Sequence, residues 1–268
     1  TLAGEPGFAS DLPLGPVREQ ILGICGIRRL LPVVAVETHV TALRLVDDDA
    51  EPLLRIEVCE RNARHPGGAG CRPLATRIEL IAEPYREDVI REVADILIDR
   101  LGAAAAQTPL VLEALAACGR RPGDYSSKIE DCLDPDERAD EAVKTLLRSL
   151  LETLVANLSG ARDHLDTEFL HDLRVATRRT RSALGQIKGV LPSEHVEDFK
   201  VRFAWLQQIT GPLRDLDVYL LDFERYGEAL PRRLRSGLDP VHAFLSARRV
   251  EAQERLAAGL SSSAFAAM

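Results

Sequence analysis

The sequence has few aromatic residues, no long apolar run and no recognisable targeting segment. Aromatic side chains make up 4% of the 268 residues, a composition more typical of helices than of a β-sandwich core. A charged residue interrupts every apolar stretch that approaches transmembrane length, and the chain shows no signal peptide. These absences predict a soluble, cytoplasmic protein with no membrane partner.

Motifs that carry chemistry are also missing. No Gly-rich phosphate loop, Ser/His/Asp set or histidine-rich metal cluster rises above chance spacing, so we expect no cofactor, no metal site and no catalytic residue. The cysteines show neither C-x-x-C spacing nor a nearby histidine pair, which predicts reduced thiols. They are Cys25, Cys59, Cys71, Cys118 and Cys132.

Charge is distributed unevenly along a chain of net charge -8. Residues 1–136 carry 15 basic and 23 acidic side chains, whereas residues 137–268 carry 19 of each. Within the second part, the segment 174–188 has five basic residues and no acidic one. A short cationic segment in an acidic protein argues against nucleic-acid binding, which usually requires an extended basic face.

That cationic segment falls in one predicted helix between Leu170 and Leu191. On a helical wheel most of its basic side chains fall within about 100°, at the edge of the apolar face, and only Arg179 points away. Guanidinium groups aligned beside a core form a site for a multivalent anion such as phosphate. The cationic strip consists of His171, Arg174, Arg178, Arg181 and Lys188.

Two further cations are candidates for the same site. Lys200 lies beside a predicted apolar face, and Arg214 follows Gly211-Pro212, where we expect one helix to end and another to begin. The free N–H groups of such a helix start would favour an anion. Asp215 and Asp217 would repel phosphate, so we expect them to orient neighbouring arginines or to cap the helix.

The alternative interpretation of the strip is structural. Its arginines could form a salt-bridge seam between helices, with partners such as Glu152 or Asp222. Likewise Lys200 could be a surface lysine, and His171 a histidine at the edge of the core.

The pattern of the whole chain predicts an α+β protein with a domain at 1–119, a linker at 120–136 and a helical bundle at 137–268. Alternating residues predict strands at Val33–Val46, Leu54–Val58 and Leu74–Ile81. Helical periodicity predicts helices at Val17–Gly23, Arg86–Leu101 (with Gly102 as its C-cap), Pro109–Cys118, 137–158, 167–190, 194–210, 213–227 and 232–260.

The motifs His171-x-x-Arg174-Val175-x-x-Arg178 and Gly211-x-x-Arg214-Asp215-Leu216-Asp217 resemble those of the CHAD family. This resemblance implies an all-α domain, of which residues 137–268 would form the first half. It also implies non-enzymatic binding of inorganic polyphosphate in the cytoplasm, with association with polyphosphate granules. The implied phosphate ligands are His171, Arg174, Arg178, Arg181, Lys200 and Arg214, with Arg179 and Lys188 of second rank.

The preceding region resembles part of a CYTH domain, a triphosphate tunnel fold, in Leu12-Pro13-Leu14-Gly15, the strands, the helix after Glu83 and Ser127-Lys128. Glu37-Thr38-His39-Val40 stands where that family carries clustered arginines, so we expect no triphosphate hydrolysis. Two alternatives remain. One is a metal-dependent triphosphate hydrolase using Glu57 and Glu79; the other is a helical module that docks an acidic protein.

Overall fold

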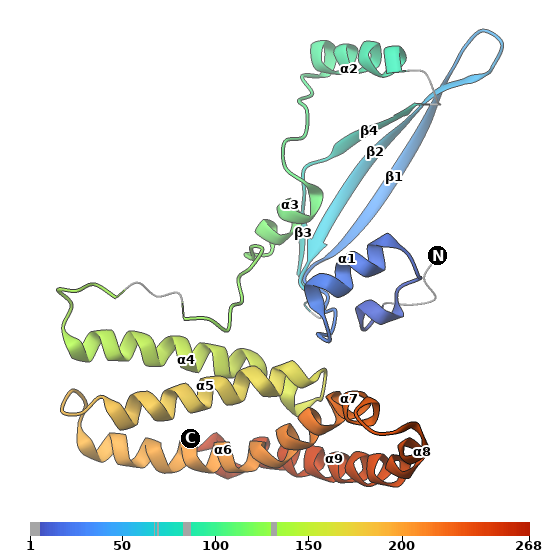
Figure 1. The fold of residues 1–268 in the computed structure, drawn as a ribbon. Coiled ribbons are helices and arrows are strands. Elements are labelled where there is room, and N and C mark those ends of the chain that lie inside the picture. Colours follow the sequence, from blue (N-terminus) through green and yellow to red (C-terminus); the bar gives the residue numbers. More distant parts are fainter. Residues whose placement is uncertain (1–5, 67, 69, 83–86, 130–132) are drawn as a thin grey trace. The chain divides into compact units, whose positions relative to one another are not determined.

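The computed structural model describes residues 6–66, 68, 70–82, 87–129 and 133–268. It confirms the α+β class, with an antiparallel sheet followed by helices (Figure 1). Its contacts divide the chain into two units: Leu31–Asp124, and Tyr125–Met268 together with the N-terminal segment up to Leu30. The sequence prediction had instead placed that N-terminal segment in the same domain as the sheet.

The unit Leu31–Asp124 contains a 4-stranded antiparallel sheet with β2 (Pro52–Arg64) in the middle. One edge of β2 pairs with β1 (Ala35–Val46). Its other edge pairs with β3 (Cys71–Pro73) and then with β4 (Arg77–Ala82). Two helices follow the sheet, α2 (Glu87–Leu101) and α3 (Leu110–Ala117).

The middle strand is longer than its sequence pattern predicts. Leu54 is buried, as the alternation over Leu54–Val58 indicates, but beyond Val58 the buried side chains are Cys59, Arg61 and Ala63, on the opposite face. The strand continues because β1 and β3 supply its backbone partners there. The predicted cap at Gly102 is confirmed: it has a φ of +64°, and its N–H donates to Ile98 at 3.0 Å. Glu83, Arg86 and Cys132 lie outside the described residues.

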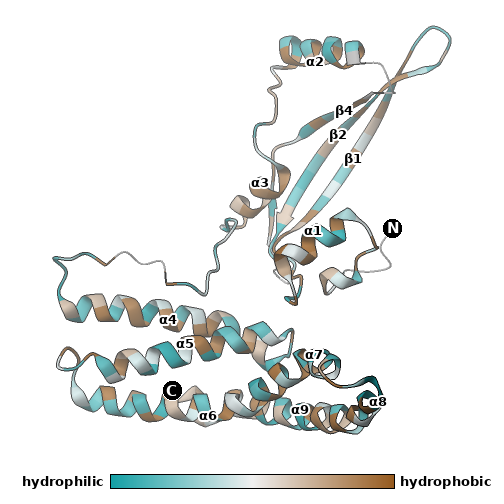
Figure 2. Ribbon diagram, in the orientation of Figure 1, coloured by the Kyte–Doolittle hydropathy of each residue, from teal (hydrophilic) through white to brown (hydrophobic). Residues whose placement is uncertain are grey.

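The second unit is a bundle whose helices α4, α5 and α6 follow one another through short connections (Figure 1). Figure 2 shows apolar and polar residues alternating along them, as amphipathic helices require. None of the helices in the described part of the chain is long and apolar enough to cross a membrane. The elements of this unit are η1 (Ala9–Asp11), α1 (Pro16–Cys25), α4 (Ala139–Arg162), α5 (Thr167–Gln186), α6 (Ser193–Leu221), α7 (Phe223–Glu228), α8 (Arg232–Arg235), η2 (Ser236–Leu238), α9 (Asp239–Leu260) and α10 (Ser263–Ala266).

The core of the bundle lies between α4, α5, α6 and α9. α4 and α5 approach closely at Gly160, where an added Cβ would lie 2.2 Å from the ring of Phe169. Only a glycine permits that spacing. The buried core residues are Leu154, Ala161, Leu170, Leu173, Ala176, Leu184, Phe203, Leu206, Leu213, Ala252, Leu256 and Leu260.

The predicted helix break at Gly211-Pro212 is wrong, because α6 runs without interruption from Ser193 to Leu221. A proline inside a helix removes one backbone hydrogen bond and costs about 3 kcal/mol. Here that cost is offset by burial of Phe203, Leu206 and Leu213, which continue the apolar packed side of the helix across the proline. No helix therefore begins at Pro212, and the free N–H groups predicted to attract an anion there do not exist.

Other helix boundaries also differ from the prediction. α5 ends at Gln186 rather than at 190, because Ile187 is extended and Gly189 has a φ of +75°. Lys188 thus lies in the connection to α6, outside the helical wheel on which it was placed. The predicted helix 232–260 is divided into α8, η2 and α9.

Candidate anion-binding site

The predicted cations gather where α5 packs against α6. The chain reverses between Gln186 and Ser193, so the two helices are antiparallel and their side chains meet in a fixed register. Arg214 reaches the first turn of α5, whereas Gln207, seven residues earlier, meets the middle of α5. By the same register Lys200, seven residues before Gln207, lies toward the C-terminal end of α5.

Arg174 is anchored to α6. Its Nη1 donates to the backbone carbonyl of Gln207 at 3.0 Å and to the hydroxyl of Thr210 at 2.9 Å. Burial lowers the pKa of Arg174 from its ordinary value. Asp215 opposes this effect, and the like charges of Arg214 and Arg178 add to it. An arginine remains cationic despite such a shift, so a positive charge is fixed at the junction of the two helices.

Gln207 connects two arginines of the strip. Its backbone carbonyl accepts from Arg174, and its side-chain oxygen accepts from the exposed Arg181. Sequence reasoning did not select Gln207. The signal was present, because Lys200, Gln207 and Arg214 are spaced seven apart and so fall on nearly the same side of a helix.

The remaining cations differ in their contacts. Arg214 is half-buried; its Nη1 donates to the carbonyl of Thr167 at 3.3 Å and lies 3.7 Å from Oε1 of Glu168. Lys200 pairs with Glu197 at 2.7 Å on its own helix. In the described part of the chain no hydrogen bond or ion pair engages the side chain of His171, Arg178 or Lys188.

Arg179 lies off the strip and has a different contact. It donates to the backbone carbonyl of Ser127 at 3.1 Å, and so holds the segment that precedes α4 against α5. The seam of salt bridges considered for the strip does not form with the expected partners. Asp222 pairs with Arg225, and among the described residues no ion pair joins Glu152 to the strip.

Asp217 orients an arginine, but not one of those predicted from the sequence. It is fully buried on α6 and accepts from Nε of Arg249 on α9 at 2.7 Å. Burial raises the pKa of Asp217, while the positive charge of Arg249 lowers it. Nη1 of Arg249 lies 2.8 Å from Nε2 of His164, whose pKa is lowered by its burial and by that same guanidinium. Asp215 is exposed, and since α6 is continuous neither aspartate caps a helix.

The sheet brings three possible metal ligands together. One ligand atom each from Glu57, Cys59 and Glu79 lies within 4.8 Å of the others. Both carboxylates already contact arginines, Glu57 with Arg55 and Glu79 with the buried Arg61. A divalent cation would have to displace those arginines, so the arrangement favours paired charges over a metal site.

Fold and charge together define a helical bundle that presents one cationic strip, supported by hydrogen bonds from the neighbouring helix. Residues 145–268 match the family model of the CHAD domain. The match begins inside α4 and covers every cation of the strip, but it excludes the sheet, for which the CYTH resemblance stays a prediction. A search of the curated proteins gives no match to the chain.

Proposed function

We propose that this protein binds inorganic polyphosphate, without hydrolysing it, through the cationic strip of α5 and the facing side of α6. One observation carries the proposal. The side chains of His171 and Arg178, which have no hydrogen bond or ion pair within the described chain, share one side of α5 with Arg174 and Arg181, which are held in place by Gln207. Fixed and unengaged cations in one row offer donors to a ligand that carries many negative charges. The match of residues 145–268 to the CHAD domain supports the same ligand, because that family is associated with polyphosphate.

The strip suits a linear polyanion better than a single phosphate. Arg174 and Arg181 are seven residues apart, which corresponds to about 10 Å along a helix axis. A chain of linked phosphates can contact several such groups in succession. Guanidinium groups bind the oxygens of each phosphate through two parallel hydrogen bonds, which strengthens the contact and fixes its direction.

A mobility shift with inorganic polyphosphate tests the proposal. The double variant Arg178→Ala/Arg181→Ala should bind much more weakly than the wild-type protein, and binding should weaken as salt rises. The matched control is Arg232→Ala/Arg233→Ala, which removes the same charge from the exposed helix α8. Equal losses in the two variants would show that net charge, and not the strip, determines binding.

The metal-dependent hydrolase is the second candidate, and the cluster of Glu57, Cys59 and Glu79 is the observation that favours it. We expect no phosphate release from triphosphate with magnesium or manganese, because the nearby arginines neutralise both carboxylates. Metal-dependent release that disappears in Glu79→Gln would overturn this expectation.

If the bundle instead docks an acidic protein, polyglutamate should displace polyphosphate at equal charge concentration.

A further inference from the structure

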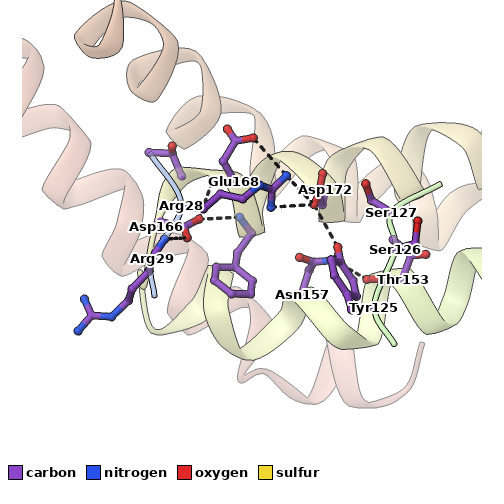
Figure 3. Close-up of polar contacts among 12 residues, drawn as sticks. Arg28, Arg29, Tyr125, Ser126, Ser127, Thr153, Asn157, Asp166, Glu168 and Asp172 are labelled. Atoms are coloured by element: carbon purple, nitrogen blue, oxygen red, sulfur yellow. Dashed lines mark hydrogen bonds and ion pairs between the residues drawn. The ribbon is translucent and has the colours of Figure 1, made fainter. Parts of the chain in front are cut away.

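The N-terminal segment contributes another arginine to this region of α5 (Figure 3). Nη1 and Nη2 of Arg28 lie 3.3 and 3.4 Å from one carboxylate oxygen of Asp172. Nη2 also lies 3.6 Å from Oε2 of Glu168. The adjacent backbone is fixed as well, because the N–H of Arg29 donates to Asp166 at 2.7 Å, while the other oxygen of Asp166 caps α5.

A second segment, which contains Tyr125, contacts the same carboxylate of Asp172. The hydroxyl of Tyr125 donates to Asp172 at 3.0 Å and accepts from the side-chain amide of the buried Asn157 at 2.7 Å (Figure 3). Burial raises the pKa of Tyr125, so it remains a donor at neutral pH. Asp172 therefore accepts hydrogen bonds from both segments, and Arg28 is held in a defined position.

Glu168 lies between this arginine and one of the predicted ligands. Its Oε2 is 3.6 Å from Nη2 of Arg28, and its Oε1 is 3.7 Å from Nη1 of Arg214. Both separations exceed a good hydrogen bond, so neither guanidinium has its donors saturated by the carboxylate. The negative charge of Glu168 nevertheless reduces the electrostatic repulsion between Arg28 and Arg214, which both lie beside it.

The position of Glu168 on the helical wheel places Arg28 at the border of the strip. Glu168 and Asp172 fall about 60° and about 100° from His171, on the side opposite Arg174. The strip on α5 is therefore bordered by α6 on one side and by the N-terminal segment on the other. His171 lies between the two borders, in the part of the strip that has no partner among the described residues.

We propose that Arg28 is part of the anion-binding surface, and that Glu168 is a positioning residue that holds Arg28 and Arg214 next to each other. This inference rests on the proposed function, because its ligand is the same inorganic polyphosphate. It extends the site beyond the segment that matches the CHAD domain, to an arginine more than a hundred residues earlier in the chain.

The first experiment compares Arg28→Ala with Arg29→Ala in polyphosphate binding. The two residues are adjacent and carry the same charge, but the guanidinium of Arg29 lies 5.4 Å from the centre of the Phe8 ring and points away from the cluster in Figure 3. Arg28→Ala should bind about fivefold more weakly, and Arg29→Ala should bind almost as the wild type does. Arg28→Lys keeps the charge and should recover most of the affinity.

Salt dependence separates a ligand contact from a merely structural contact. As for other linear polyanions, each lost cationic contact should lower the slope of log affinity against log salt by about 0.7–0.9. Arg28→Ala should show this reduction and Arg29→Ala should not. Equal affinities and equal slopes in the two variants, with binding by the wild type intact, would overturn the inference and leave the proposed function standing. Absence of binding by the wild type would overturn both.

The direction in which Glu168→Gln changes the binding affinity distinguishes two roles for Glu168. If Glu168 only repels the ligand, its neutralisation should strengthen binding. If it positions the two arginines, binding should weaken by about threefold and the salt slope should fall, because Arg28 is then held by Asp172 alone and no charge lies between it and Arg214. Glu168→Asp keeps the carboxylate and should retain the slope of the wild type. Unchanged or tighter binding by a Glu168→Gln protein with normal thermal unfolding would refute the positioning role.

Discussion

Replacement of Arg178 by alanine is the most direct test of the strip. Arg178 is exposed on α5, and its side chain makes no hydrogen bond or ion pair within the described chain, so its removal should leave the bundle intact. A hydrogen bond to a charged group contributes about 1.5–3 kcal/mol. Because Arg178 is exposed, solvent screening favours the lower end of that range, which corresponds to about tenfold weaker polyphosphate binding.

Arg179 supplies the matched control for this substitution. It is the next residue, has the same charge and is also exposed, but it contacts the carbonyl of Ser127 and not the strip. Arg179→Ala should therefore weaken binding by less than about threefold. The assay is a titration of labelled polyphosphate at about 0.1 M salt, repeated at about 1 M, where screening should bring the two variants together. Equal losses for Arg178→Ala and Arg179→Ala at low salt would refute the helical-wheel argument.

Three further predictions concern the strip, protonation and packing. His171→Gln removes a side chain on the strip that makes no hydrogen bond or ion pair within the described chain, and it should weaken polyphosphate binding in the same titration while leaving the bundle intact. Burial raises the pKa of Asp217, so the folded state binds a proton at this carboxylate more readily than the unfolded state does. The folded state therefore loses stability as pH rises above about 4. Asp217→Asn has no such carboxylate and should gain stability relative to the wild type between about pH 4 and pH 7 in denaturant titrations. Gly160→Ala should lower the free energy of unfolding by about 1–3 kcal/mol through a clash with Phe169, whereas Gly185→Ala, which meets open space on α5, should not lower it.

Sequence reasoning succeeded where the information is local. The side of α5 that carries Arg174, Arg178 and Arg181 follows from the spacing of residues within one helix, because a helix of that length has a fixed period. The C-cap at Gly102 likewise depends only on the conformation of one residue. Three of the four described strands were located, but β3 (Cys71–Pro73) was missed, and the extension of β2 beyond Val58 depends on backbone partners supplied by other strands.

Sequence reasoning failed where distant segments decide the outcome. Gly211-Pro212 has the local pattern of a helix break, but packing of the residues on either side keeps α6 continuous. The partner of Asp217 is Arg249, and no spacing rule connects two residues on different helices. The N-terminal segment is irregular in sequence and gives no indication that Arg28 contacts α5.

The sequence by itself determined which side of α5 is cationic, since the order of side chains around a helix follows from its period. Tertiary structure alone decided which of those cations are held and which have no side-chain partner among the described residues. Gln207 engages Arg174 and Arg181, and Glu168 lies between Arg28 and Arg214. The physical reason is that hydrogen bonds and ion pairs act over a few ångströms, so they depend on which segments the fold brings together and not on their separation along the chain.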